Sequence, residues 1–230
     1  MFARYSISAT LEDLGTRFSV DVPPGYVPQY NAAPTHLLPV ITNDSRKGIS
    51  FFYWGAPPIM ANKKQLGEKI INTKAEILAE RQVALKKVKE RRCLVPADGF
   101  YAWKRTGKKT SIPYRFTMKD KSLFALAGLW EEFDNEHGEM FHTFSIITTA
   151  SNPSVAAIDE RMPAILLLEN EGRWLEGEDE HFLISQLVPY PDSLEYYSVS
   201  SRVNFPERND KMVISPAPPA DQFGNLSLFD

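Results

Sequence analysis

Few residues of this sequence could do chemistry, and they form none of the common catalytic patterns. There is one cysteine, Cys93, and the four histidines are scattered, at His36, His137, His142 and His181. No pair or triplet of them has the spacing of metal ligands, and we expect neither a metal nor a cofactor. The sequence has no glycine-rich phosphate loop, no nucleophile elbow and no supported Cys–His or Ser–His pairing. General motifs therefore leave the reaction open.

Cys93 has two opposing features in its surroundings. It follows Arg91 and Arg92, whose charges can lower the pKa of a thiol and make it reactive. It also lies at the start of an apolar run, in a segment, 91–103, whose composition indicates a buried strand, a turn and a second strand. We expect a buried structural thiol rather than a nucleophile.

The charge is distributed unevenly along the chain. The net charge is −3, but residues 61–109 carry 14 Lys/Arg and 5 Asp/Glu, a net of +9, and the rest carries 12 and 24, a net of −12. Such asymmetry permits a polyanion to bind one face of an acidic protein. The plainer interpretation is a solvated helix followed by a basic turn at 104–109.

Length and composition favour one large α+β domain. The chain has 230 residues, of which 43% are hydrophobic and 12% aromatic, enough for a substantial core. One cysteine excludes an internal disulfide framework and fits a reducing cytosol. The N-terminus has no apolar run of signal-peptide length, and the apolar stretch 49–61 is interrupted by prolines and too short to span a bilayer. We expect a cytoplasmic protein with no membrane partner.

Hydrophobic periodicity predicts the elements that position the candidate residues. Residues 1–40 are rich in turn signals, and 73–92 has the period of an amphipathic helix. The acidic stretch 169–180 is expected to be a second helix. Strands are predicted at 49–54, 93–103, 112–118, 123–133, 140–149 and 196–199. The tail from 216 onward is expected to be loosely held.

Nine sequence blocks resemble, in the same order, those of the SOS response-associated peptidase (SRAP) family. The blocks are 1–5, 31–35, 54–55, 72–76, 91–103, 127–131, 144–150, 158–163 and 203–204. Each block is weak alone, but nine in order indicate the family's fold. The resemblance implies a single domain over 1–215 with a mixed, mainly antiparallel, barrel-like β core and flanking helices, followed by a tail at 216–230.

The resemblance also implies a chemistry on single-stranded DNA. An abasic site opens to an aldehyde, and the family's cysteine, N-terminal after Met removal, supplies both an amine and a thiol. Condensation and thiol addition close a thiazolidine ring that caps the lesion, assisted by a Glu, a His and an Asn. The same cysteine is associated with removal of a propeptide in some members, hence the family name.

This chain departs from the family at three of those four positions. Phe2 stands for the cysteine, Ala102 for the Glu and Asp159 for the His, and only Asn72 is retained. Phe2 supplies no thiol, and its bulk predicts that Met1 stays in place. Ala102 transfers no proton, and an aspartate is mostly ionised at pH 7 where a histidine is poised to titrate. Three losses at one site predict that crosslinking and self-cleavage are lost.

The other family positions that line the strand groove or support the pocket are mostly kept. They are Arg4, Asn31, Pro34, Trp54, Trp103, Thr148 and Arg161, with Lys74 in place of the family's Arg. Tryptophan faces can stack on bases and arginines can bind phosphates, although tryptophans are also common core residues. A lysine keeps the charge without the bidentate geometry of arginine.

Three functions follow from these expectations. The first is a DNA-damage protein that binds single-stranded or abasic-site DNA without the crosslinking chemistry. The second is an enzyme with altered chemistry, in which the Met1 amine or Lys74 forms a Schiff base and Asp159 assists. The third is a protein-interaction module that uses the acidic stretch 169–180 as its contact.

Overall fold

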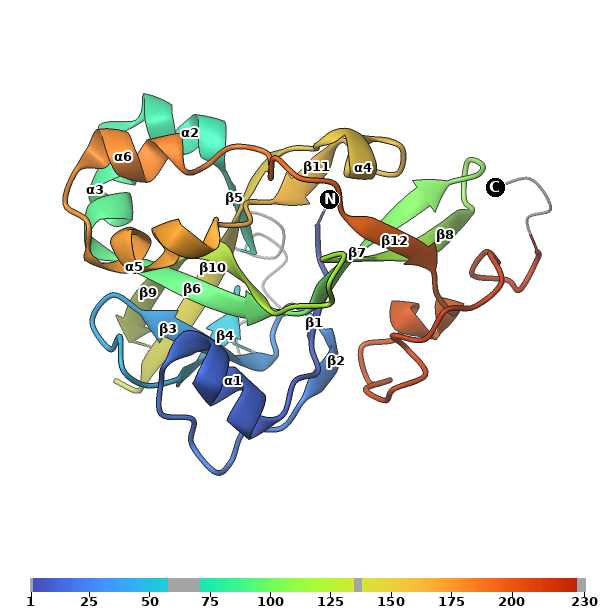
Figure 1. The fold of residues 1–230 in the computed structure, drawn as a ribbon, viewed down its shortest axis with the longest axis horizontal. Helices are drawn as coiled ribbons and strands as arrows, with labels where there is room; N and C mark the ends of the chain where they lie inside the picture. Colours follow the sequence, from blue (N-terminus) through green and yellow to red (C-terminus); the bar gives the residue numbers. More distant parts are fainter. Residues whose placement is uncertain (1, 58–70, 135–137, 227–230) are drawn as a thin grey trace.

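A computed structural model describes residues 2–57, 71–134 and 138–226. It contains two β-sheets joined through a shared core, with helices at the periphery (Figure 1). Met1 and His137 lie outside the described residues.

The larger sheet is a closed ring of mostly antiparallel strands. Its order is β11 (Arg161–Pro163), β10 (Met140–Ala150), β4 (Ser50–Trp54), β3 (Leu37–Thr42), β6 (Arg92–Ala97) and β9 (Phe124–Asp134). Because β9 also pairs with β10, the strands from β10 to β9 close on themselves. The short strand β5 (Asn72–Lys74) adds to β10 in parallel, directly beyond β4. The expected barrel-like α+β fold is confirmed.

The second sheet has five strands and carries the start of the chain. Its order is β12 (Glu195–Ser198), β8 (Ser111–Thr117), β7 (Gly99–Arg105), β1 (Tyr5–Ile7) and β2 (Gln29–Ala32). All of its pairings are antiparallel. The N-terminal residues thus enter the molecule beside β7, which continues from barrel strand β6.

Helices cover the outside of these sheets (Figure 1). They are α1 (Leu11–Phe18), α2 (Ala75–Glu80), α3 (Gln82–Glu90), α4 (Pro153–Ala156), α5 (Leu168–Glu176), α6 (Glu180–Ser185) and the 3-10 turn η2 (Ser201–Asn204). Among the described residues, no helix is both long and apolar enough to cross a bilayer.

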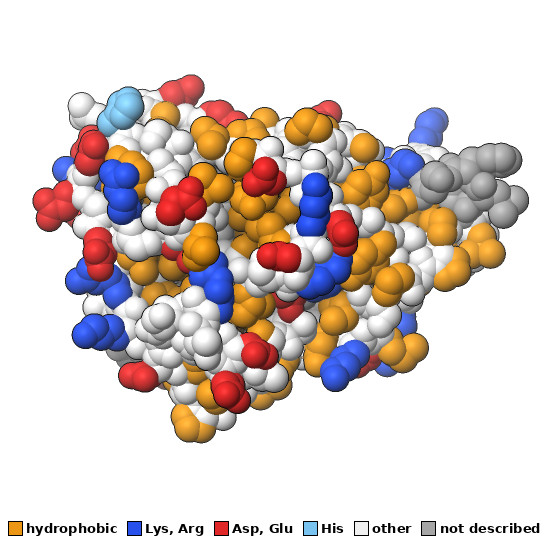
Figure 2. All heavy atoms as spheres, in the orientation of Figure 1, with side chains coloured by type: hydrophobic (Ala, Val, Ile, Leu, Met, Phe, Trp, Pro, Cys, Tyr) orange, Lys and Arg blue, Asp and Glu red, His pale blue; other side chains and the backbone are white. Residues whose placement is uncertain are grey.

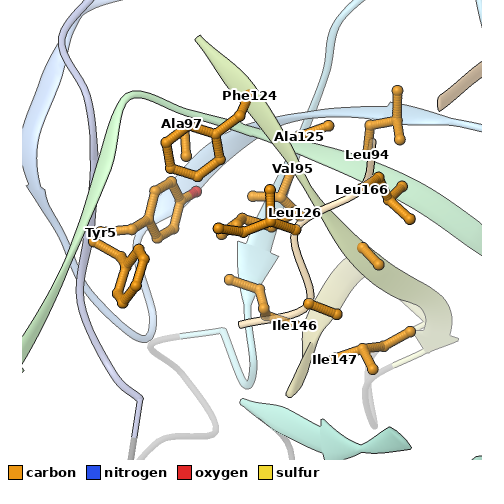
Figure 3. Close-up of a cluster of buried hydrophobic side chains, with 14 of the residues drawn as sticks. Tyr5, Leu94, Val95, Ala97, Phe124, Ala125, Leu126, Ile146, Ile147 and Leu166 are labelled. Carbon is orange, nitrogen blue, oxygen red and sulfur yellow. The ribbon is translucent and has the colours of Figure 1, made fainter. Parts of the chain in front are cut away.

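The barrel interior is filled by branched and aromatic side chains. Figure 3 shows Val95 and Leu126 packed beside Ile146, with Tyr5 and Phe124 at the junction with the second sheet. All five are at most 3% exposed. Burial of this apolar surface is the main stabilising contribution to the fold.

A buried ion pair joins the two sheets at the β6–β7 turn. Arg115 donates to the Asp98 carboxylate at 2.7 Å, and the hydroxyls of Ser6 and Ser8 donate to the same carboxylate. Gly99 is required here because a Cβ atom would lie 2.7 Å from the Arg115 guanidinium. The turn is therefore fixed where the chain passes from the barrel to the strand bearing Ala102.

Several sequence-based boundaries were wrong. The helix expected over 73–92 begins as strand β5 and is divided into α2 and α3 at Arg81. The strand candidate 93–103 is divided at Asp98 into β6 and β7, which confirms the strand, turn and second strand indicated by its composition and places the two strands in different sheets. The acidic helix ends at Glu176, and 1–40 contains β1, α1, β2 and the start of β3.

The described part of the tail is anchored, contrary to expectation. Ala217 N donates to Ser198 O at 3.0 Å, and the Gln222 side chain accepts from Ser111 N at 3.1 Å. Asp221 is 6% exposed and accepts hydrogen bonds from its own loop. These contacts extend the ordered structure past residue 215.

Candidate functional site

Phe2 occupies the place where the resemblance would put a thiol, and its ring is buried. The side chain is 4% exposed, and its ring centroid lies 5.6 Å from Trp54 and 6.1 Å from Phe100. The ring belongs to the main hydrophobic core. Position 2 therefore contributes packing, and its side chain carries no nucleophile.

Asn72 fixes the backbone of this N-terminal residue. It lies on β5, where the parallel pairing of Asn72 with Ile146 sets its direction, and its Nδ2 donates to the carbonyl of Phe2. Its Oδ1 is buried and has no hydrogen-bond partner among the described residues. An unsatisfied buried acceptor is costly, so this oxygen marks a polar position of the site.

Ala102 and Trp103 face opposite sides of β7. Side chains alternate along a strand, so Ala102 shares a face with Phe100, whose ring contacts Phe2. Trp103 points to a separate cluster with Tyr101 and Val203, and its Nε1 donates to Asn204 Oδ1 at 2.8 Å. A carboxylate at position 102 would face Phe2, but Ala102 offers only a methyl group there.

Two further candidates, Thr148 and Asp159, form hydrogen bonds with a third, Arg161. Its guanidinium donates to both Glu76 carboxylate oxygens, at 2.6 and 3.1 Å, and to Thr148 O and Oγ1, at 2.5 and 3.1 Å. Its backbone N donates to Asp159 Oδ1 at 3.0 Å. The Arg161 hydrogen bonds lower the pKa of Glu76. Arg161 Nε is buried and lacks a hydrogen-bond partner within the described residues.

A cavity of about 860 Å³ brings these residues together. Its lining is Phe2, Asn72, Thr73, Lys74, Ile77, Arg81, Lys87, Thr148, Asp159, Glu160 and Arg161. Three of the four positions that the resemblance assigns to catalysis therefore line this cavity together with Lys74 and Arg161. The fourth position, Ala102, does not line it. Among the described residues, no group of three or more His, Cys, Asp or Glu is placed to hold a metal ion.

The remaining candidates lie away from this cavity or beneath it. Trp54 is fully buried, its Nε1 donating to Ile71 O at 2.8 Å, so it supports the floor and presents no face for stacking. Arg4 binds Asn31 Oδ1 at 2.9 Å and Val203 O at 2.8 Å, and Asn31 is itself fully buried. Pro34 is half-buried in the loop between β2 and β3.

Cys93 is confirmed as a buried thiol. It is fully buried and free, and burial raises its pKa. Its Sγ would lie 2.7 Å from a Cβ at Gly128, which shows how closely β6 and β9 approach. A protonated thiol without solvent access is not a nucleophile.

Many charges of the basic stretch are paired with acidic residues elsewhere. Lys87 pairs with Glu131, Lys89 with Glu180 and Arg91 with Glu132, while Arg92 is 3% exposed and donates to backbone carbonyls. Figure 2 shows cationic and anionic side chains interspersed at the left of the view, where α3 and α6 lie in Figure 1. The sequence asymmetry therefore overstates the positive field around α3.

Sequence reasoning missed Arg81, Lys87 and Glu76 as neighbours of the site. Arg81 lines the cavity from the junction of α2 and α3 and Lys87 from within α3, while Glu76 binds Arg161. The predicted continuous helix concealed the first two. Glu76 was within a family block, but its partner lies 85 residues away in the sequence.

The sequence matches one family model and is similar to proteins named as abasic site processing proteins. The family model described as "SOS response associated peptidase (SRAP)" matches residues 1–206. The chain is 39% identical over 221 residues to the abasic site processing protein YoqW of Bacillus subtilis, covering 93% of this chain and 99% of that protein. It is 28% identical over 235 residues to the abasic site processing protein HMCES of Rattus norvegicus, covering 85% and 67%.

Solved structures resemble the fold over most of its length. A protein from Bacteroides thetaiotaomicron superposes with a TM-score of 0.75 at 27% identity, covering 93% of this chain and 99% of that one. A protein from Bordetella bronchiseptica superposes with a TM-score of 0.71 at 22% identity, covering 86% and 99%, which concerns the fold alone. With the family model spanning nearly the whole domain, the chain belongs to the SOS response-associated peptidase (SRAP) family.

Proposed function

We propose that this protein binds single-stranded or gapped DNA at abasic sites and does not form the thiazolidine crosslink or cleave itself. The observation that carries the proposal is the buried ring of Phe2, 4% exposed and packed on Trp54 in the position of the family's thiol. A thiazolidine needs an amine and a thiol on one residue, and position 2 has no thiol.

The two other substitutions act in the same direction. Ala102 lies on the same face of β7 as Phe100, whose ring packs against Phe2, and its methyl group accepts no proton. Asp159 accepts a hydrogen bond from Arg161 N, and a carboxylate so placed is a poor substitute for an imidazole as a proton shuttle near neutral pH. The thiol, the carboxylate and the imidazole that the thiazolidine reaction requires are thus all absent.

The cavity beside Phe2 supports binding of a polyanion. Lys74, Arg81 and Arg161 line it, and guanidinium and ammonium groups bind phosphates through charge-assisted hydrogen bonds. Its volume of about 860 Å³ is in the range of sites that take a nucleotide-sized ligand. The family relatives named as abasic site processing proteins support DNA as the ligand, in a DNA-damage context.

The position of Lys74 among the described residues does not favour the Schiff-base alternative. A nucleophilic lysine at neutral pH is normally desolvated in a pocket, whereas Lys74 is exposed. The alternative nucleophile, the amine of Met1, lies outside the described residues. Asp159 would have to assist either amine while bonded to Arg161 N.

The protein-interaction alternative is also weakened by the ion pairs. Three carboxylates of the acidic stretch are already used inside the chain: Glu171 pairs with Arg17, Glu176 with Arg46 and Glu180 with Lys89. Glu171 is 6% exposed. A partner would have to compete with these contacts.

The test combines a binding assay with a denaturing gel, using an oligonucleotide that carries one abasic site. We expect fluorescence anisotropy to report salt-sensitive binding and the gel to show no heat-stable adduct. A stable adduct would refute the loss of chemistry. Absence of binding to abasic, gapped and intact single strands at low salt would refute the DNA assignment. Borohydride trapping of a complex would favour the Schiff-base enzyme.

A further inference from the structure

The chain interrupts a favourable helical segment at Arg81. Residues 75–90 contain neither glycine nor proline, yet Arg81 has φ −120° and ψ 121° between α2 and α3. Arg81, the N-cap residue of α3, makes no side-chain capping hydrogen bond. Where a local sequence preference is overridden without an evident local cause, a functional constraint is a common reason.

The break places Arg81 at the junction of two cavities. The first is the 860 Å³ cavity beside Phe2, and the second, of about 400 Å³, lies along α2, α3 and β10. Both are lined by Thr73, Ile77, Arg81 and Lys87. The two cavities are therefore neighbours, and Arg81 is one of the four residues that line both.

The second cavity has a mixed wall that suits a nucleotide. Ile77 is 38% exposed and Val83 is 76% exposed, so an apolar surface faces solvent there. Thr73 and Ser145 supply hydroxyls, their Oγ atoms 3.3 Å apart, at the base of the same cavity. Single-strand sites usually combine a basic groove with aromatic faces on which bases stack. Here the cations are present, and aliphatic side chains take the place of the aromatic face.

The second cavity is lined by two cationic residues, Arg81 and Lys87, and they differ in their ion pairing. Lys87 forms an ion pair with Glu131, which also lines the second cavity. The Arg81 carbonyl accepts hydrogen bonds from Ala84 N and Leu85 N at the start of α3. The Arg81 side chain is exposed, and the residue lines both cavities. Phosphate binding is thus expected at Arg81, with Lys87 moderated by Glu131.

We propose that the 400 Å³ cavity binds the nucleotide on one side of the abasic position and that Arg81 binds the phosphate between the two. This inference rests on the proposed DNA binding and adds the location of one flanking nucleotide.

The experiment measures anisotropy with three oligonucleotides containing a stable tetrahydrofuran abasic analogue. In one the analogue is internal, in the second it is at the 5′ end, and in the third at the 3′ end. Arg81→Gln is expected to weaken binding of the internal oligonucleotide and of one terminal oligonucleotide by on the order of tenfold. Binding of the other terminal oligonucleotide should be unchanged. For the two oligonucleotides whose binding weakens, the slope of log affinity against log salt concentration should fall by about one released counterion.

Matched controls separate a local contact from a general loss of charge. Arg46→Gln removes the same charge from an exposed ion pair with Glu176 that lines neither cavity, and it should leave all three affinities unchanged. Glu131→Gln releases Lys87 and should strengthen binding of the same two oligonucleotides by about two- to threefold. Thermal melting checks that each variant is folded.

Two results would overturn the inference while leaving the DNA assignment intact. One is wild-type binding that Arg81→Gln does not change with any oligonucleotide. The other is an equal loss with all three, which would place Arg81 on the lesion itself. Failure of the wild-type protein to bind any of them would instead overturn the proposed function.

Discussion

Asn72 holds the backbone of Phe2 through a hydrogen bond from its Nδ2 to the Phe2 carbonyl. In this chain the retained Asn therefore anchors a core residue, since the ring of Phe2 packs on Trp54 and Phe100. Position 2, where the family resemblance implies a cysteine, is part of the hydrophobic core in this chain. The surrounding cavity and its cations remain in place.

Truncation of Phe2 should destabilise the protein. Phe2→Ala removes a buried aromatic ring and leaves a cavity, which costs about 3 kcal/mol of unfolding free energy. Urea unfolding followed by fluorescence measures this change. Val83→Ala, at a position 76% exposed, is the control and should change stability by less than about 0.5 kcal/mol. A loss below about 1 kcal/mol for Phe2→Ala would show that the ring is not a core element.

Restoring the three family residues should restore crosslinking. Phe2→Cys supplies the thiol and a small second residue that permits Met removal, and Ala102→Glu and Asp159→His return the proton-transfer groups. We expect a heat-stable adduct with abasic DNA from the triple variant and none from the wild type. Intact mass should show one protein per oligonucleotide. A triple variant that is folded and binds DNA, yet forms no adduct, would mean that the site geometry has also diverged.

The barrel strands could be predicted from the sequence because they are apolar and separated by turns. The expected strand 140–149 is β10 (Met140–Ala150), and 49–54 is β4 (Ser50–Trp54). The break at Arg81 could not be predicted, since periodicity continues through it. The turn at Asp98, in contrast, could be predicted, because Pro96, Asp98 and Gly99 are turn residues. The assignment of β6 and β7 to different sheets and the buried ion pair of Asp98 with Arg115 are tertiary features that the composition does not show.

The grouping of site residues came from the resemblance and not from spacing. Asn72 and Asp159 are far apart in the sequence and meet because β5 and β11 both pair with β10. One error was avoidable. Alternation along β7 already places Trp103 on the face opposite Ala102, away from the cavity.

Removing the Glu76 carboxylate should release Arg161 for phosphate binding. Arg161 now donates to both Glu76 oxygens, and the side chain of Glu76 is 53% exposed, so the pair adds at most about 0.5 kcal/mol to stability. Glu76→Gln should therefore leave the melting temperature nearly unchanged and strengthen binding of single-stranded DNA by about two- to threefold at low salt. Weaker binding would show that Glu76 is needed to orient Arg161.

The same pair predicts a small dependence on pH. The Arg161 hydrogen bonds lower the folded-state pKa of Glu76 below its unfolded value. Its contribution to stability is therefore complete above the unfolded pKa and is lost as the pH falls through the folded pKa. The difference in unfolding free energy between wild type and Glu76→Gln should shrink toward zero in acid. A difference that persists at the lowest accessible pH would mean that the carboxylate charge is not its source.

Breaking the buried pair at the β6–β7 turn should be much more costly. Asp98 accepts from Arg115 at 2.7 Å, and both side chains are at most 10% exposed, so Asp98→Ala leaves an uncompensated buried guanidinium. We expect a loss of about 3–5 kcal/mol, measured by urea unfolding. Glu132→Ala breaks the exposed pair with Arg91 and should cost less than about 1 kcal/mol.

A double variant distinguishes the buried charge from lost packing. Asp98→Ala with Arg115→Met removes both charges, so it should be more stable than Asp98→Ala alone although it makes fewer contacts. If instead the two losses simply add, the cost of Asp98→Ala does not come from an unpaired Arg115. It would then come from the Ser6 and Ser8 groups, which also lose their acceptor.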